Sequence, residues 1–246
     1  MDRMLYIAMN GAKQNMLAQA SNSNNLANVS TPGFRADFAN LRSMPVFGNG
    51  HPTRAYAMAE RPGVDLNPGS LSSTGNPLDI AIDNEGYIAV QAADGSEAYT
   101  RAGNLRLTAA GVLLSGSGEP VQGNGGPISL PPSSKVEIST EGTISVLPLG
   151  QNDGVMQEID RIKLVNPPPA DLYKGNDGLL RLKDGGQSPA NANVRVVSNA
   201  LEMSNVNMAE SLVNMIDLAR QFELHVKMMR TADKQAEQAA QLMRLS

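Results

Sequence analysis

The 246-residue sequence contains no cysteine and no tryptophan, and aromatic residues make up only 4% of it. The absence of cysteine excludes disulfides, thiolate catalysis and cysteine-ligated metal sites. No apolar run reaches the roughly 18 residues of a membrane span, so we expect no membrane insertion. Charged residues make up only 18%, and a net charge of -4 without a cluster of Lys and Arg argues against nucleic-acid binding. The start of the chain lacks a basic segment followed by an apolar core, so we expect no cleavable signal peptide.

The sequence also has few residue patterns that indicate a catalytic, metal or cofactor site. The only histidines, His51 and His225, lie far apart and without carboxylates at metal-ligand spacing, so we expect no metal site. The glycine-rich segments lack the spacing of a dinucleotide loop, so we expect no cofactor. Asp79, Asp83 and Glu85 lie close together, but turn chemistry explains the last two. The sequence therefore favours a protein that is not an enzyme.

A long helix is predicted at the N-terminus, from about residue 2 to residue 28. Spacings of four and three, typical of a helix that packs along another helix, define one stripe: Leu5, Met9, Ala12, Met16, Gln19, Ser23 and Leu26. Its end is crowded with asparagines, Asn24, Asn25 and Asn28, which lower helix propensity. They fit either a frayed last turn or amides that bridge neighbours in a dense bundle. A helix-ending motif follows, because Pro and Gly break the helix: Thr31, Pro32, Gly33 and Phe34.

The C-terminal region, residues 205–246, carries a longer stripe of the same kind. Its members are Met208, Leu212, Met215, Ala219, Phe222, Val226, Met229, Asp233, Ala236, Ala240 and Met243. A stripe sustained over five heptads predicts a coiled-coil-like helix, roughly 60 Å long at the usual rise per residue. Pattern alone does not choose the number of helices that pack together.

Between these ends, the sequence predicts a β-rich domain. Leu78–Ile82 and Tyr87–Gln91 flank a four-residue turn signal and predict a hairpin. Further strands are predicted at 105–107, 112–114, 128–130, 136–138, 143–147, 162–165 and 179–182. Many short strands separated by turns suggest a barrel or a sandwich. The predicted fold class is α+β: residues 1–30 with 205–246 form a coiled-coil-like helical pair, 31–67 a connector, and 68–204 an all-β domain.

The two apolar stripes are too long for the β domain to cover. The end helices must therefore pack on each other, on copies from other chains, or on both. An intramolecular helical hairpin and a dimeric coiled coil are the simpler alternatives. Because isolated helices are marginal in water, we expect the ends to be poorly ordered in a free monomer and to become ordered on assembly.

Three motifs in the chain resemble the rod, hook and hook-associated family of bacterial flagellar axial proteins. The first spans Asn24–Asn28 with Thr31, Gly33 and Phe34. The last is Leu201-Glu202-Met203-Ser204-Asn205-Val206-Asn207, and Pro77–Ile82 with Tyr99–Asn104 resemble the family's first β domain. Met1–Arg3, Ser30–Ala36 and Ala219–Glu223 are most similar to subunits of the proximal rod.

The resemblance implies a structural subunit of the flagellar basal-body rod that polymerises through its terminal helices and transmits motor torque. Expected partners are other rod proteins, copies of the chain itself and the type III export apparatus, and the expected location is the rod crossing the periplasm. Expected subunit contacts are Leu5, Met9, Ala12, Met16, Asn24, Asn25, Leu26, Asn28, Leu212, Met215, Ala219, Phe222, Val226, Met229, Ala236, Ala240 and Met243. The alternatives are a distal-rod subunit, an exported cell-wall-binding or hydrolytic β-domain protein that uses Asp79 and Asp83, and an exported surface adhesin.

Overall fold

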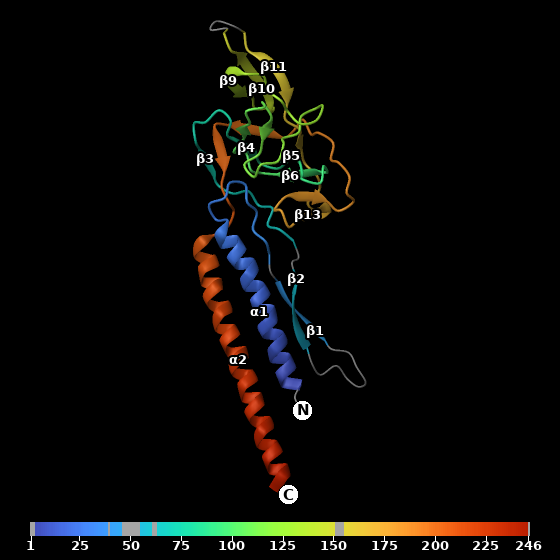
Figure 1. The fold of residues 1–246 in the computed structure, drawn as a ribbon, viewed down its shortest axis with the longest axis vertical. Coiled ribbons are helices and arrows are strands. Elements are labelled where there is room, and N and C mark those ends of the chain that lie inside the picture. The colour runs from blue at the N-terminus through green and yellow to red at the C-terminus, as the bar shows by residue number, and fades with distance from the viewer. Residues whose placement is uncertain (1–2, 39, 46–54, 61–62, 151–154, 246) are drawn as a thin grey trace. The chain divides into compact units, whose positions relative to one another are not determined.

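The computed structural model describes residues 3–38, 40–45, 55–60, 63–150 and 155–245 (Figure 1). The chain forms two compact units, each containing segments that are distant in sequence. The helical unit comprises Met1–Ala27, Asp37–Gly63 and Asn207–Ser246. The β unit comprises Asn28–Ala36 and Val64–Val206. The stretch predicted as a connector thus contributes residues to both units.

In the helical unit, long helices form at both ends of the chain, as predicted. The elements are α1 (Arg3–Ala27), β1 (Asn40–Pro45), β2 (Ala55–Glu60) and α2 (Met208–Leu245). The two helices lie side by side, and α1 also packs against β2 (Figure 1). β1 and β2 form an antiparallel ribbon with Asn40 opposite Glu60.

Local chemistry sets the ends of the helices. The side-chain oxygen of Asn207 accepts hydrogen bonds from the backbone N–H groups of Ala209 (3.0 Å) and Glu210 (3.3 Å), and so caps the first turn of α2. α1 ends at Ala27, and the N–H of Thr31 then donates to the carbonyl of Asn28 in a turn.

The β unit contains short strands in several sheets. The largest sheet has the order β12-β5-β6-β14-β13, a second has the order β11-β10-β9, and three pairs are β15-β4, β16-β3 and β7-β8. The β-rich centre is therefore confirmed, but the described strands do not form a closed barrel. The elements are β3 (Leu71–Ser73), β4 (Ile80–Asp83), β5 (Tyr87–Gln91), β6 (Glu97–Thr100), β7 (Arg106–Leu107), β8 (Leu113–Leu114), β9 (Ser133–Ile138), β10 (Thr143–Pro148), β11 (Gln157–Arg161), β12 (Leu164–Val165), η1 (Pro169–Asp171), β13 (Leu172–Lys174), β14 (Leu180–Leu182), β15 (Arg195–Ser198) and β16 (Ala200–Glu202).

The strand β5, which lies between β12 and β6, is buried on both faces. Ile88 and Val90 belong to the larger apolar cluster, whereas Tyr87 and Ala89 belong to a second, smaller cluster. Because side chains alternate along a strand, one sheet can separate two cores in this way. The β unit therefore has its own apolar interior.

Two strand predictions were wrong. The strands β4 and β5 do not pair as a hairpin, because β4 pairs with β15 and β5 pairs with β6 and β12. The turn between β4 and β5 has positive φ at Asn84 and Gly86, and it passes so close to Val194 that Gly86 has no room for a side chain. Residues 128–130 form an isolated bridge from Ser129 to Val112 and no named strand. These pairings are non-local, so local turn signals do not reveal them.

Candidate functional site

A buried carboxylate ties together distant segments of the β unit. Glu202, the last residue of β16, has a side chain that is 1% exposed. Its Oε1 accepts hydrogen bonds from Nη2 of Arg35 (2.6 Å) and from the backbone N–H of Gly69 (2.8 Å). Its Oε2 accepts from Nη1 of Arg101 (2.9 Å). One carboxylate is therefore shared by two guanidinium groups and one amide.

Arg101 is held by more than its ion pair. Its Nη2 donates to the carbonyl of Asn84 (2.7 Å), and its guanidinium lies 5.3 Å from the centroid of the Tyr87 ring. Burial raises the pKa of Tyr87, and the positive charge of Arg101 opposes that shift. Arg101 therefore joins the ion network to the face of β5 that carries Tyr87.

The network contains more positive than negative charge. Among the described residues, Nε and Nη1 of Arg35 and Nε of Arg101 are buried without a hydrogen-bond partner. Removing one member of a buried ion pair is costly because it leaves an uncompensated charge away from water. Glu202 is thus the member whose loss would leave two buried cations without their shared anion.

Asn205 completes the same junction with its amide. Its side-chain oxygen accepts from the N–H of Ala36 (2.8 Å), and its Nδ2 donates to the carbonyls of Asp65 (3.0 Å) and Asn67 (3.1 Å). An amide that uses both its donor and its acceptor in this way fixes three chain segments at once. We call the set Arg35, Arg101, Glu202 and Asn205 the junction.

Gly33 brings the helix-ending motif into the junction. Its N–H donates to the carbonyl of Glu202 (2.8 Å), and its φ is +70°. A Cβ at Gly33 would collide with the backbone of Arg101 and Ala102. Only glycine satisfies both the left-handed conformation and the close approach. Beside it, Nζ of Lys174 donates to the carbonyl of Arg35 (2.8 Å) and lies 4.0 Å from the centroid of the Phe34 ring.

The helical unit presents a second candidate surface, which is best described by the three faces of α1. The first face meets α2: a Cβ at Gly11 would collide with the imidazole of His225, and Nδ2 of Asn22 donates to the carbonyl of Ser211 (2.7 Å). Ala8, Ala12 and Ala18 are buried. Small residues allow the two helices to approach closely.

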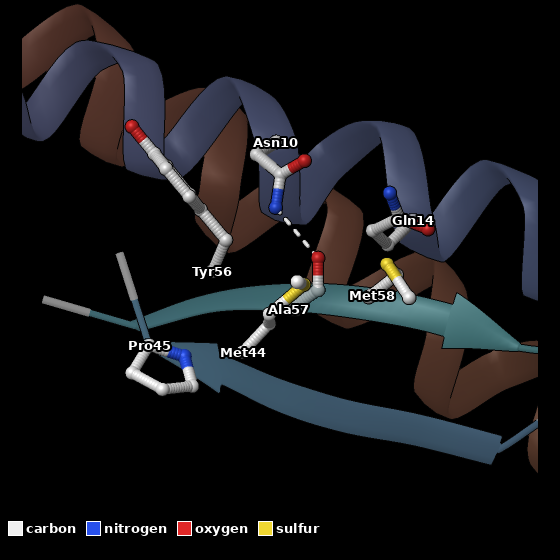
Figure 2. A pocket seen from close by; sticks show the side chains of 7 residues that line it. All are labelled: Asn10, Gln14, Met44, Pro45, Tyr56, Ala57 and Met58. Carbon is white, nitrogen blue, oxygen red and sulfur yellow. Dashed lines mark hydrogen bonds between the residues drawn. The ribbon is translucent and has the colours of Figure 1, made fainter. Parts of the chain in front are cut away.

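The second face of α1 lies against the β1–β2 ribbon. Nδ2 of Asn10 donates to the carbonyl of Ala57 (2.6 Å), as Figure 2 shows. Beside this bond lies a cavity of about 410 Å³, lined by Asn10, Gln14, Met44, Pro45, Tyr56, Ala57 and Met58. The ribbon therefore covers part of α1 and leaves a mainly apolar hollow.

The third face of α1 is open in the single chain. Met9 is 53% exposed and Met16 is 59% exposed, and Leu5 is also exposed. These are members of the predicted stripe, whereas Ala12 from the same stripe is buried. We call Leu5, Met9 and Met16 the open face of α1.

The other predicted contact residues fall into two groups. On α2, Met215, Ala219, Phe222, Val226, Met229 and Ala236 are half-buried, whereas Leu212, Ala240 and Met243 are exposed. In the asparagine cluster, Asn25 makes two bonds of 2.9 Å with the backbone of Asp37, and Oδ1 of Asn28 accepts from the hydroxyl of Thr31 (3.1 Å). Asn24 is exposed and Leu26 is half-buried.

Asp79 and Asp83, the acidic residues considered for catalysis, do not form a pair with a shared site. Asp79 is buried, and its carboxylate accepts from Oγ1 of Thr74 (2.6 Å) and Nδ2 of Asn76 (3.0 Å) in a local turn. Asp83 is exposed at the end of β4. The described residues contain no group of His, Asp and Glu suited to a metal ion. Nor does any described helix have the length and apolar character needed to cross a membrane.

Comparison with known proteins reveals three family matches. Residues 5–35 match the flagella basal body rod protein family, residues 81–146 the D1 domain of the flagellar hook protein FlgE/F/G family, and residues 197–242 the C-terminal domain of the flagellar basal body rod FlgEFG family. The flagellar basal-body rod protein FlgF of Escherichia coli is 40% identical over 252 residues, which cover 100% of both chains. The chain belongs to the flagellar basal-body rod protein family. FlgF of Salmonella typhimurium is also 40% identical over the full length, and FlgG of Buchnera aphidicola from Acyrthosiphon pisum is 32% identical over 97% of this chain and 98% of its own.

Each of the three matched segments of this rod-family chain supplies one charge of the junction. Arg35 ends the first matched segment, Arg101 lies in the second and Glu202 in the third. The sequence analysis did not find the pairing of these three charges. Each family motif contains one of these charged residues, and that was the only sign of the network in the sequence. The spacing of the motifs along the chain does not show that the three side chains meet in the fold.

Proposed function

We propose that this chain is a structural subunit of the flagellar basal-body rod that assembles with other rod proteins and with copies of itself through its terminal helices. The observation that supports this is the large apolar surface that both helices leave uncovered. Exposed apolar side chains include Leu5, Tyr6, Met9, Met16 and Leu17 on α1, and Leu212, Val213, Ile216 and Leu224 on α2. Extended exposed apolar surfaces mark interaction sites.

The packing of α1 on α2 supports a coiled-coil-like core that is completed by neighbouring chains. On α2, a stripe of buried or half-buried residues recurs at spacings of four and three: Ser211, Met215, Leu218, Phe222, His225, Met229 and Ala232. Of these, Ser211 and His225 contact α1 at Asn22 and Gly11. Yet among the described residues Nδ2 of Asn15, Oγ of Ser21 and Nδ1 of His225 are buried without hydrogen-bond partners. Unpaired buried polar atoms weaken a helix pair.

Because the pair of helices in one chain leaves apolar side chains exposed and buried polar atoms unpaired, we propose that the helices become fully ordered only on assembly. Circular dichroism of purified monomer and of assembled rods would then show more helix per chain in the rods. Equal helix content in the two samples would contradict the ordering step and leave the assembly proposal standing.

In the assembled rod, we propose that the helices of many chains form the inner core and the β units the surrounding layer. Interlocked helix contacts would resist twisting and so pass torque along the rod without any catalysed reaction. The location would be the basal body, in the rod crossing the periplasm, and the chain would reach it unfolded through the type III export apparatus.

A charge placed on the open face of α1 tests the assembly proposal. The double substitution Met9→Glu with Met16→Glu should abolish rod assembly and motility, because burying two carboxylates between helices is costly. The matched control is Val155→Glu, since Val155 is 87% exposed in the β unit and outside the helices. Normal motility of the double variant, at normal protein level, would overturn the proposal.

The position within the rod is proximal in this proposal, because Met1–Arg3, Ser30–Ala36 and Ala219–Glu223 resemble subunits of the proximal rod. Relatives named FlgF match over the full chain at 40% identity, and the proposal takes FlgF as the proximal and FlgG as the distal subunit. Complementation separates it from the distal alternative. The gene should restore motility to a strain lacking FlgF and not to a strain lacking FlgG. The opposite pattern would assign the chain to the distal rod.

The enzymatic alternative is not favoured. The carboxylate of Asp79 is engaged by Thr74 and Asn76, and Glu202 is engaged by two arginines, so neither is free to act as an acid or a base. The substitution Asp79→Asn with Asp83→Asn should leave motility intact.

A further inference from the structure

The chain contains three Asn-Gly pairs, at residues 10–11, 49–50 and 124–125. An asparagine before glycine is chemically vulnerable, because the backbone nitrogen of the glycine can attack the asparagine side chain and glycine has no Cβ to hinder the approach. The pair at 49–50 lies outside the described residues. The other two lie in opposite environments, so the fold decides which of them can react.

The pair Asn10-Gly11 is protected by α1. Both residues lie inside the helix, so the N–H of Gly11 is used in a helical hydrogen bond, and attack by its nitrogen would break the regular backbone. The side-chain nitrogen Nδ2 of Asn10 donates to the carbonyl of Ala57 (2.6 Å), which fixes this side chain toward β2 (Figure 2). Gly11 is itself buried against His225. Neither member of this pair is therefore free to react.

The pair Asn124-Gly125 lies in an exposed turn of the β unit. The turn comprises residues 123–126, which we call the glycine turn, and the N–H of Gly123 donates to the carbonyl of Gly126 across it (2.7 Å). Asn124 and Gly125 are both exposed, and no described residue forms a hydrogen bond with the side chain of Asn124 or with the N–H of Gly125. A Cβ at Gly125 would meet nothing within 4 Å, so the space beside it is open.

We propose that Asn124 is a site of spontaneous deamidation in the folded chain. The nitrogen of Gly125 gives up its proton to water and attacks the side-chain carbonyl carbon of Asn124. The bond from that carbon to Nδ2 then breaks, and the nitrogen takes up a proton and leaves as ammonia. Water opens the resulting cyclic imide at either carbonyl, which gives aspartate or isoaspartate at position 124. The reaction needs only the folded chain and water, so it does not depend on the proposed function.

The product disturbs the contact that the glycine turn makes with β11. Oδ1 of Asp160 accepts from the N–H of Asn124 (3.3 Å) and from the N–H of Arg161 (2.7 Å), and a Cβ at Gly123 would collide with the same carboxylate. Deamidation places a second negative charge beside Asp160, and like charges repel. Isoaspartate also adds a methylene group to the main chain, which shifts the turn relative to Asp160. The modification therefore lowers the stability of the β unit.

Mass spectrometry of the full-length chain after prolonged incubation in neutral buffer tests the site. Deamidation changes the mass of the peptide that contains the asparagine, so peptide mapping follows Asn10 and Asn124 separately. In the folded chain Asn124 should convert many-fold faster than Asn10, whereas in urea the two rates should be similar, because unfolding exposes both pairs. Equal conversion of the two asparagines in the folded chain, or an unconverted Asn124, would overturn the proposal.

Two variants separate the reaction from its effect on stability. Gly125→Ala should slow the conversion of Asn124 several-fold, because the new methyl group hinders the attacking nitrogen. It should not lower the urea midpoint, since Gly125 has no positive φ and open space beside it. Undiminished conversion would show that Gly125 is not the nucleophile. Asn124→Asp reproduces one product and should unfold at a lower urea concentration than the natural chain, whereas Asn193→Asp, at another exposed position of the β unit, should not. An unchanged midpoint for Asn124→Asp would overturn the loss of stability.

Discussion

Arg35 and Glu202 stand 167 positions apart in the sequence, and their side chains form a buried ion pair of 2.6 Å. Glu202 belongs to the segment that leaves the β unit toward α2, and Arg35 belongs to the segment that enters it after α1. The β unit is therefore closed by contacts between its first and last segments.

Glu202→Gln should destabilise the β unit by about 3–5 kcal/mol, because it leaves two buried guanidinium groups without an anion. Urea unfolding followed by tyrosine fluorescence, to which the buried Tyr87 and Tyr99 of the β unit contribute, would measure the change. The matched control is Glu137→Gln, which removes an exposed ion pair with Lys135 and should cost less than about 1 kcal/mol. Equal costs for the two substitutions would show that the junction does not hold the unit together.

Gly33→Ala should also destabilise the β unit, through both its backbone conformation and a collision. Gly75 provides the comparison, because its φ of +73° is similar to that of Gly33 and a Cβ there would meet nothing. Gly75→Ala should cost about 1 kcal/mol from strain alone. Gly33→Ala should cost clearly more, since its Cβ would also displace Arg101 and Ala102. Equal losses in urea unfolding would mean that the close approach carries no energy.

Because Tyr99 is buried, the stability of the β unit should fall at alkaline pH. Burial raises the pKa of its phenol above the ordinary value, and the acceptor Glu97 adds to that shift, although the N–H of Ser188 opposes it. Because the folded-state pKa is the higher one, this contribution is complete below the unfolded-state pKa of about 10 and is lost as pH rises above it. Ultraviolet titration should show phenols that titrate late in the native chain, and Tyr99→Phe should remove one of them while Tyr87 remains. If all phenols titrated alike in folded and urea-unfolded chains, the prediction would be wrong.

The sequence predicts the elements of this fold better than their contacts. The two terminal helices and most strands follow from local periodicity, and the turn after α1 follows from Pro32 and Gly33. By contrast, the pairing of β4 with β15 and the meeting of Arg35, Arg101 and Glu202 depend on residues brought together across most of the chain. Local pattern carries no information about such partners.

The helix faces show a subtler limit. The predicted stripe of α1 follows its large apolar residues, Leu5, Met9 and Met16, which are exposed. By contrast, α1 meets α2 at Gly11, and its buried residues include the small Ala8 and Ala18. Hydrophobic periodicity locates an apolar face, and close helix packing prefers small side chains. A helix with two partners can therefore show both patterns, displaced from each other around its axis.

The contact between Gly11 and His225 gives a prediction whose sign depends on the background. In a helix, alanine is favoured over glycine by about 1 kcal/mol. In the natural chain Gly11→Ala should nevertheless lower the stability of the helical unit, because the new methyl group collides with the imidazole. In a His225→Ala background the collision is gone, so the same substitution should raise stability. Thermal unfolding monitored by far-ultraviolet circular dichroism in all four chains decides the matter: a stabilising effect of Gly11→Ala in both backgrounds would mean that α1 and α2 do not pack at this point.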